Sequence, residues 1–321
     1  MTHSQSLIHL VFNGEIYNYR ILRDELKKEG ASFNTQTDTE VILNAYFIWG
    51  WEKTLEKLEG MFSIGLFDEK ENLFYLARDR FGMKPLFYAE FKNNLIFSSE
   101  IKSVLNYTQN RKLNLLNSLN PIFTTGLSPR GTSMFDSVEQ LEPGHYLRYD
   151  LVEKKFRVVE YFHLSNWVSE DQYNFIASAN KNHVLQLYED ALNDSVKLHL
   201  ISDAPLGIMF SAGLDSSLIS AVASNFINKK LSLFYFESDN QDDAHFANEF
   251  TKKFNGELIS AKGGDNNYIF DLPKMIYHFE TINKADSIVL GNLCKLAQKK
   301  GVLLLIENNV ITKKNLRKFH P

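Results

Sequence analysis

The sequence has little of what extracellular, metal-binding and membrane proteins need. Its one cysteine, Cys294, excludes an internal disulfide framework and suits a reducing, cytoplasmic compartment. Its nine histidines show no His-Glu-x-x-His or comparable metal-ligand spacing. No apolar run approaches membrane-spanning length, and residues 1–6 do not lead a basic segment into an apolar one, so no secretory signal is predicted.

An excess of positive charge is missing as well. The chain has 35 Lys and Arg against 39 Asp and Glu, a formal charge of −4, so we expect no nucleic-acid partner and no anionic membrane surface. Hydrophobic residues make up 44% of its 321 residues, which is enough for two domain cores. The composition therefore predicts a two-domain globular protein, and it leaves a homodimer open.

The first half alternates short apolar segments with turn residues. Strands are expected at 7–12, 62–66, 73–77, 86–91, 95–98 and 144–149, and helices at 19–29 and 39–49. Asn13-Gly14 follows the first expected strand as a turn signal. This order of elements predicts a layered α+β domain rather than a doubly wound one.

The pattern changes after a polar, weakly periodic stretch at 166–181, which we interpret as a linker between domains 1–165 and 182–321. Strands are expected beyond it at 206–210, 231–236 and 302–306, with helices at 184–196, 218–227, 244–254 and 287–299. Strand and helix alternate, which predicts an α/β domain with a parallel sheet. Ligands of such sheets bind at the carboxyl ends of the strands.

A small-residue loop stands at one of these carboxyl ends. Its sequence is Ser211-Ala212-Gly213-Leu214-Asp215-Ser216-Ser217. A strand, a tight loop and a helix in this order turn backbone N–H groups and hydroxyls toward an anion. Gly213 is expected to allow a positive φ or a close backbone approach, and the Asp-Ser-Ser run to cap the helix. The alternative is a plain capped turn; neither a P-loop nor a nucleophile-elbow pattern is present.

Four further motifs occur in order in the first half. They are Asn-Gly-Glu-Ile-Tyr-Asn-Tyr at 13–19, Thr-Asp-Thr-Glu at 37–40, Ala-Arg-Asp-Arg-Phe-Gly-Met-Lys-Pro-Leu-Phe-Tyr at 77–88 and Phe-Ser-Ser-Glu-Ile-Lys at 97–102. With the loop at 211–217, which is similar to a pyrophosphatase-type Ser-Gly-Gly-x-Asp-Ser loop, the chain resembles the glutamine-hydrolysing asparagine synthase family. The family joins an N-terminal-nucleophile-type glutaminase sandwich to an ATP-pyrophosphatase domain.

The resemblance implies a carbon–nitrogen ligase of asparagine biosynthesis. Ammonia from glutamine would react with an aspartyl-adenylate made from aspartate and ATP. Asn13 and Gly14 would form the oxyanion hole of the glutaminase, since an amide and a backbone N–H are suitable donors. Glu15 and Asp38 would join them in binding glutamine by holding its α-amino group. The alternatives are a plain hairpin turn at Asn13-Gly14 and a helix N-cap at Asp38.

The resemblance also implies a nucleotide site, with ATP and magnesium as cofactors and glutamine, aspartate and ATP as substrates. The phosphates would be wrapped by Ser211, Gly213, Ser216 and Ser217. Asp215 would help hold the magnesium that accompanies pyrophosphate. Phe210, through its backbone, and Phe236 would line the nucleotide pocket; the alternative is that both side chains are core. The motif at 77–88 is expected to be structural, its alternative being a turn with solvated charges.

The sequence departs from the family at both ends. The family's nucleophile is an N-terminal cysteine, but no cysteine precedes Cys294, so the nucleophile is expected to be absent and both domains truncated. Thr2 would be N-terminal after removal of Met1, but it stands only a few residues before Asn13. Glu307-Asn308-Asn309 replaces a glycine-rich phosphate loop, and 280–286 lacks the expected aspartate-site pattern. Two alternative functions remain. One is an amidotransferase that acts on another carboxylate or on a sugar in surface-polysaccharide synthesis, and the other is an inactive fragment or nucleotide-binding module.

Overall fold

The computed structural model describes residues 1–3, 6–123, 129–166, 168–202, 204–237, 241–262, 268–280, 286–302, 304–306 and 311–312. The chain divides into two compact units, Met1–Ser169 and Glu170–Pro321. No helix within the described ranges has both the length and the apolarity to cross a membrane.

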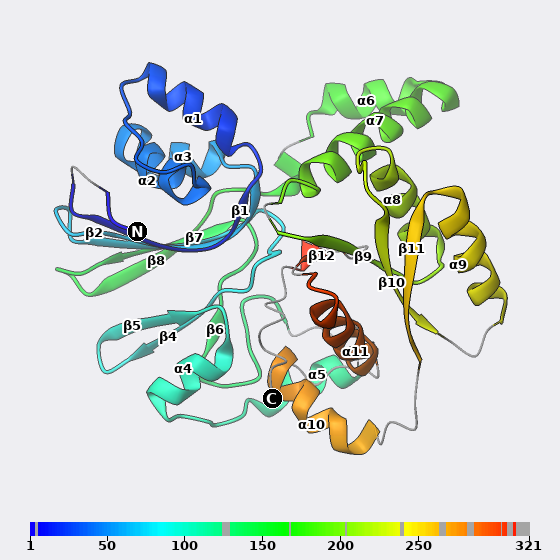
Figure 1. The fold of residues 1–321 in the computed structure, drawn as a ribbon. Coiled ribbons are helices and arrows are strands. Elements are labelled where there is room, and N and C mark those ends of the chain that lie inside the picture. Colours follow the sequence, from blue (N-terminus) through cyan, green and yellow to red (C-terminus); the bar gives the residue numbers. More distant parts are fainter. Residues whose placement is uncertain are drawn as a thin grey trace. The chain divides into compact units, whose positions relative to one another are not determined.

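Unit 1 has four layers, with two sheets between helices (Figure 1). The larger sheet has the order β1-β2-β3-β7-β8, with bounds Ile8–Ile16, Gly60–Asp68, Leu73–Arg78, His145–Asp150 and Lys155–Glu160. The smaller sheet has the order β5-β4-β6, with bounds Asn94–Ser98, Phe87–Phe91 and Glu139–Gln140. The helices are α1 (Tyr19–Lys28), α2 (Asp38–Trp49), α3 (Trp51–Lys57), α4 (Ile101–Thr108) and α5 (Leu115–Phe123).

Each interface between these layers has its own apolar cluster. Buried leucines of α1 and α3, Leu26 and Leu55, pack with Leu10 and Ile64 of the larger sheet. The two sheets meet through a second cluster, and β4 packs on α4 through a third. Burying a large aliphatic side chain contributes about 1.5–3 kcal/mol, so these clusters hold the layers together. The layered α+β arrangement that the sequence predicts is the one observed.

β1 does not end at Asn13-Gly14, as the sequence suggested, but continues to Ile16. Gly14 lies opposite Phe62 of β2 and has no positive φ. A Cβ on Gly14 would overlap the carbonyl oxygen of Met61 and lie 2.7 Å from the Cα of Phe62. The glycine is therefore needed for close approach of two strands rather than for a turn, and the hairpin interpretation is wrong.

Unit 2 contains a five-stranded sheet in the order β11-β10-β9-β12-β13. The strands are β9 (Leu206–Phe210), β10 (Leu231–Glu237), β11 (Gly256–Lys262), β12 (Leu304–Ile306) and β13 (Ile311–Thr312). The first four strands are parallel, and β13 runs antiparallel to β12. The helices are α7 (Lys181–His199), α8 (Leu214–Ser224), α9 (Gln241–Lys253), α10 (Tyr268–Phe279) and α11 (Asp286–Lys299). The parallel α/β sheet expected from the sequence is present.

A helix, α6 (Glu170–Ser178), occupies most of the segment that we interpreted as a linker. None of its residues is buried, so its sequence lacks the apolar periodicity from which a helix is predicted. Glu170 and Asp171 lie in its first turn, where negative charge favours the helix dipole. The prediction of a linker without regular structure therefore missed a helix. The departures at 281–285 and 307–309 lie outside the described residues.

Candidate functional site

The outer edge of β1 carries the first group of predicted site residues. The backbone carbonyl of Phe62 points toward the side of β2 on which β3 lies, because it accepts a hydrogen bond from Asp79 N–H at 2.9 Å. Gly14, opposite Phe62, is therefore in a non-hydrogen-bonded pair, and its N–H points away from β2. Ile8 and Leu10 lie an even number of residues from Gly14, so their backbone groups point the same way as those of Gly14. Both form backbone hydrogen bonds on this outer edge, Ile8 O with His3 N–H at 2.9 Å and Leu10 N–H with Met1 O at 2.8 Å. The N–H of Gly14 thus faces the edge beyond these N-terminal residues.

Asn13 and Glu15 flank Gly14 and share the opposite face of β1 from the buried Ile16. The Asn13 side-chain amide donates to Ser99 Oγ at 3.0 Å, just after β5. Glu15 lies close enough to Tyr17 to add to the effect of burial, which raises the pKa of the Tyr17 phenol. An amide donor, a backbone N–H and a carboxylate are thus brought together at one end of β1.

Asp38 reaches the same end of β1 from α2. Its Oδ2 accepts a hydrogen bond from the Ile16 N–H at 3.1 Å, two residues along the edge from Gly14. Asp38 is not the N-cap, because Thr37 occupies that position and its hydroxyl accepts from Glu40 N–H. The N-cap interpretation of Asp38 is therefore wrong, and its carboxylate ties the start of α2 to the edge of β1.

The turn after β3 is held by two buried charged side chains, Arg78 and Asp79. Asp79 has no exposed surface, and its carboxylate accepts hydrogen bonds from four backbone N–H groups, at 2.9–3.3 Å: those of Phe62, Phe81, Met83 and Lys84. Arg78 is 8% exposed and donates to three carbonyls. Burial raises the pKa of the Asp79 carboxyl, although these hydrogen bonds oppose that effect. The solvated-turn alternative is wrong.

Thr2, which would be N-terminal after removal of Met1, does not lie near Gly14 along β1. Thr2 pairs with His9, five positions along β1 from Gly14, and these correspond to about 17 Å of strand. Its hydroxyl lies 3.1 Å from His9 Nδ1. Cys294 is fully buried in the core of unit 2, where it packs with Leu293 and Ala297.

The second group of predicted residues lies where β9 passes into α8. Ala212 has a φ of +61°, whereas Gly213 has a φ of −77° and is the N-cap of α8. The positive φ therefore falls on the alanine, not on the glycine as expected. A left-handed conformation costs a residue with a Cβ about 1–2 kcal/mol. Asp215, Ser216 and Ser217 lie within the first turn of α8 and do not cap it.

Hydroxyls close the loop from inside. Ser216 Oγ accepts from Ser211 N–H at 3.2 Å and lies 3.2 Å from Gly213 O, to which it can donate. Ser211 Oγ accepts from Gly213 N–H at 3.4 Å and lies 3.0 Å from Ser216 Oγ. One direction of donation, from Ser211 to Ser216 to Gly213 O, satisfies every contact. Ser216 has no exposed surface, so its hydroxyl shapes the loop instead of facing solvent.

This network leaves the first turn of α8 available to an anion. Ser217 N–H bonds to Gly213 O, so the N–H groups of Leu214, Asp215 and Ser216 have no acceptor within the helix. Ser217 Oγ is buried and has no hydrogen-bond partner among the described residues. Asp215 is exposed, and in the same parts of the chain no three Asp, Glu, His or Cys side chains gather as a metal site. Asp215 alone fits magnesium only if phosphate oxygens supply further ligands.

Phe210 and Phe236 lie on opposite faces of the sheet. Phe210 pairs with Tyr235, and its ring lies 4.9 Å from that of Phe250 in α9. Phe236 follows Tyr235 and packs on the cluster that contains Cys294 of α11. The two side chains therefore cannot line one pocket. Phe210 is 2% exposed, which agrees with the core alternative for its side chain.

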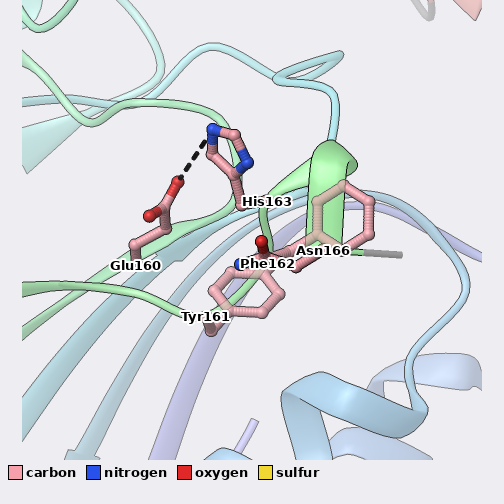
Figure 2. Close-up of a pocket in the computed structure, with 5 residues that line it drawn as sticks. All are labelled: Glu160, Tyr161, Phe162, His163 and Asn166. Carbon is pink, nitrogen blue, oxygen red and sulfur yellow. Dashed lines mark ion pairs between the residues drawn. The ribbon is translucent and has the colours of Figure 1, made fainter. Parts of the chain in front are cut away.

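No motif in the sequence indicated one cavity of unit 1. This cavity of about 250 Å³ is lined by Glu160, Tyr161, Phe162, His163 and Asn166 (Figure 2). Glu160 and His163 approach each other to 4.0 Å across it. It contains none of the predicted site residues, and its lining residues belong to one short stretch that begins with the last residue of β8.

Comparisons with known proteins agree with the division of motifs between the units. A glutamine amidotransferase domain model matches residues 1–162, and an asparagine synthase model matches residues 187–307. Two solved structures are only distantly alike. The glutamine PRPP amidotransferase of B. subtilis, complexed with ADP and GMP, has 12% identity and a TM-score of 0.37 and covers 81% of this chain and 62% of that chain.

Curated relatives are more similar. Asparagine synthetase [glutamine-hydrolyzing] 1 of Bacillus subtilis is 31% identical over 84% of this chain and 41% of the relative. Number 3 of the same organism is 33% identical over 69% of this chain and 34% of the relative. A putative asparagine synthetase 1 of Methanocaldococcus jannaschii is 29% identical over 93% and 51%. The chain thus spans between a third and a half of the length of these relatives. It belongs to the glutamine-hydrolysing asparagine synthetase family.

Proposed function

We propose that unit 1 binds glutamine along the outer edge of β1. The observation that carries this proposal is the convergence of Asn13, Gly14, Glu15 and Asp38 at one end of that strand. The outward N–H of Gly14 and the Asn13 amide would face the side-chain carbonyl of glutamine, where negative charge develops during hydrolysis. The carboxylates of Glu15 and Asp38 would hold the α-ammonium group.

Unit 2 would bind the phosphates of ATP at the first turn of α8. Three N–H groups without an acceptor in the helix, the positive end of the helix dipole and the Ser217 hydroxyl suit an anion there. Asp215 would contribute one oxygen to magnesium, which would neutralise phosphate charge when bound. With the relatives' activity, this gives ATP-dependent amidation of aspartate by glutamine-derived ammonia, through an aspartyl-adenylate.

Binding of glutamine precedes its hydrolysis and can be measured by itself. Calorimetric titration of the full chain with glutamine tests the site. Asp38→Asn should weaken binding about 10- to 100-fold, since a hydrogen bond to a charged group contributes about 1.5–3 kcal/mol. Absence of binding by the unaltered chain, or equal binding by the variant, contradicts the proposal.

The nucleotide site is tested by titration with magnesium ATP. Asp215→Asn should weaken binding of magnesium ATP more than that of ATP without magnesium, because the carboxylate acts through the metal. Asp171→Asn, in the first turn of α6, is the matched control and should change neither affinity. Formation of AMP with a panel of carboxylic acids and ammonia then identifies the acceptor. We expect aspartate to be preferred, and preference for another acid or for a sugar contradicts that assignment.

A further inference from the structure

The loop before α2 is held by a buried carboxylate. Glu40 is 8% exposed and lies in the first turn of the helix. Its Oε1 accepts from Asn34 N–H at 2.7 Å, and its Oε2 accepts from the N–H and hydroxyl of Thr35 at 2.6 and 2.7 Å. Three hydrogen bonds from one carboxylate thus fasten the chain three to four residues before Asp38.

A buried guanidinium holds the same loop through its carbonyl groups. Arg23 of α1 is 5% exposed and donates to Thr35 O at 2.7 Å and to Thr37 O at 3.1 Å. It also reaches the Gln36 side chain at 3.3 Å, and it lies 4.4 Å from the ring centroid of Phe33. Arg23 therefore fixes the residue immediately before Asp38, and Glu40 fixes the loop from the other side.

The two side chains determine where Asp38 begins α2. The N-cap, Thr37, is bonded to Arg23 through its carbonyl and to Glu40 N–H through its hydroxyl. Asp38 then has a defined backbone position from which its carboxylate reaches Ile16 N–H. Burial alone would raise the pKa of Glu40, but its hydrogen bonds hold that pKa below its ordinary value. The carboxylate is therefore ionised near neutral pH, as its acceptor role requires.

We propose that Glu40, together with Arg23, is a positioning residue that holds Asp38 where it recognises the α-ammonium group of glutamine. This inference rests on the proposed glutamine site. Glu40 makes its contacts within the loop and acts on the ligand only through Asp38. A carboxamide in its place has one acceptor oxygen and would set an NH2 group against a backbone N–H. The loop would loosen, and Asp38 would lose its fixed direction.

The test compares two ligands on the full chain. Glu40→Gln should weaken glutamine binding about tenfold or more, yet leave the affinity for glutaramate, which lacks the α-amino group, nearly unchanged. Glu29→Gln, whose carboxylate bonds Trp49 Nε1 at the end of α1, is the control and should alter neither affinity. In the Glu40→Gln, Asp38→Asn double variant, glutamine binding should be no weaker than in Asp38→Asn. Equal losses for both ligands, or additive losses in the double variant, overturn the inference.

A second measurement does not depend on glutamine. Hydrogen exchange of the Ile16 amide reports the bond to Asp38 and should quicken about tenfold or more in Glu40→Gln but not in Glu29→Gln. If Glu40→Gln does not fold, Thr35→Ala takes its place in this measurement. It removes one hydrogen bond to Glu40 and should quicken the exchange of the Ile16 amide to a smaller extent. Unchanged exchange of Ile16 in a folded Glu40→Gln or Thr35→Ala protein contradicts the role of Glu40. Failure of the unaltered chain to bind glutamine contradicts the glutamine site itself.

Discussion

Asp79 and Phe62 are joined by two hydrogen bonds. The Phe62 N–H donates to Asp79 Oδ2 at 3.3 Å, and the Asp79 N–H donates to Phe62 O at 2.9 Å. Because Phe62 is the residue against which Gly14 packs, this pair links the turn after β3 to the candidate glutamine site.

Asp79→Asn should therefore destabilise unit 1. An amide cannot accept from all four N–H donors, and it introduces donors of its own. We expect the free energy of unfolding to fall by about 2–4 kcal/mol, measured by urea unfolding followed by tryptophan fluorescence. Asp150→Asn is the control, because Asp150 Oδ1 accepts two N–H groups in an exposed turn. If Asp79→Asn lowers the free energy of unfolding no more than the control does, the stabilising role of Asp79 in this turn is contradicted.

Ala212→Gly should stabilise unit 2, since glycine adopts a φ of +61° without strain. The expected gain is up to about 1 kcal/mol, because the greater freedom of glycine in the unfolded chain offsets part of the relief. The matched control is Ala221→Gly within α8, which should destabilise by about 1 kcal/mol. Thermal unfolding of both variants decides: the same sign for both shifts rules out strain at Ala212.

Gly14→Ala should disrupt the pairing of β1 with β2. The added Cβ meets backbone atoms of Met61 and Phe62, which cannot rotate away as a flexible side chain can. We expect a loss of more than about 3 kcal/mol in unfolding free energy or failure to fold. Gly213→Ala is the control, because its Cβ would approach only Ser211 Oγ, at 3.3 Å. Similar stability of the two variants would show that the close approach is not required.

Unit 1 should lose stability in acid partly through Glu40. Its folded pKa lies below the ordinary value of 4.5, so the unfolded state binds the proton first. The contribution of Glu40 is therefore complete above that value and is lost as the pH falls through the folded pKa. Urea unfolding at neutral pH and at about pH 4 and 3 should show the difference between the unaltered chain and Glu40→Gln shrinking on acidification. A constant difference contradicts this linkage.

The fold was largely accessible from the sequence wherever apolar periodicity was strong. The strand at Leu206–Phe210 has the expected bounds, because a run of buried residues between turn signals is unambiguous. α6 was missed since it buries nothing, and β8 was missed because its residues are mostly exposed. The residues of both elements show too little apolar pattern to be recognised, and β8 is defined by its pairing with β7.

Four of the predicted site residues converge at one end of β1, but the sequence did not predict their geometry. Asn13, Gly14, Glu15 and Asp38 meet, yet the sequence suggested a turn where β1 continues. It also assigned the positive φ to Gly213 instead of Ala212. Glycine signals freedom in general, and only the structure shows whether that freedom serves φ or close packing. The opposite faces of Phe210 and Phe236 follow from strand pairing, which no local pattern reveals.

The N-terminal residues pair antiparallel with β1, with Thr2 opposite His9. Residues added before Met1 would continue along the same edge, and about four of them would reach the position opposite Gly14. A purification tag fused to Met1 would therefore lie over the proposed glutamine site and compete with the ligand as an added strand. Affinity measurements for glutamine should therefore compare the chain with and without such a tag.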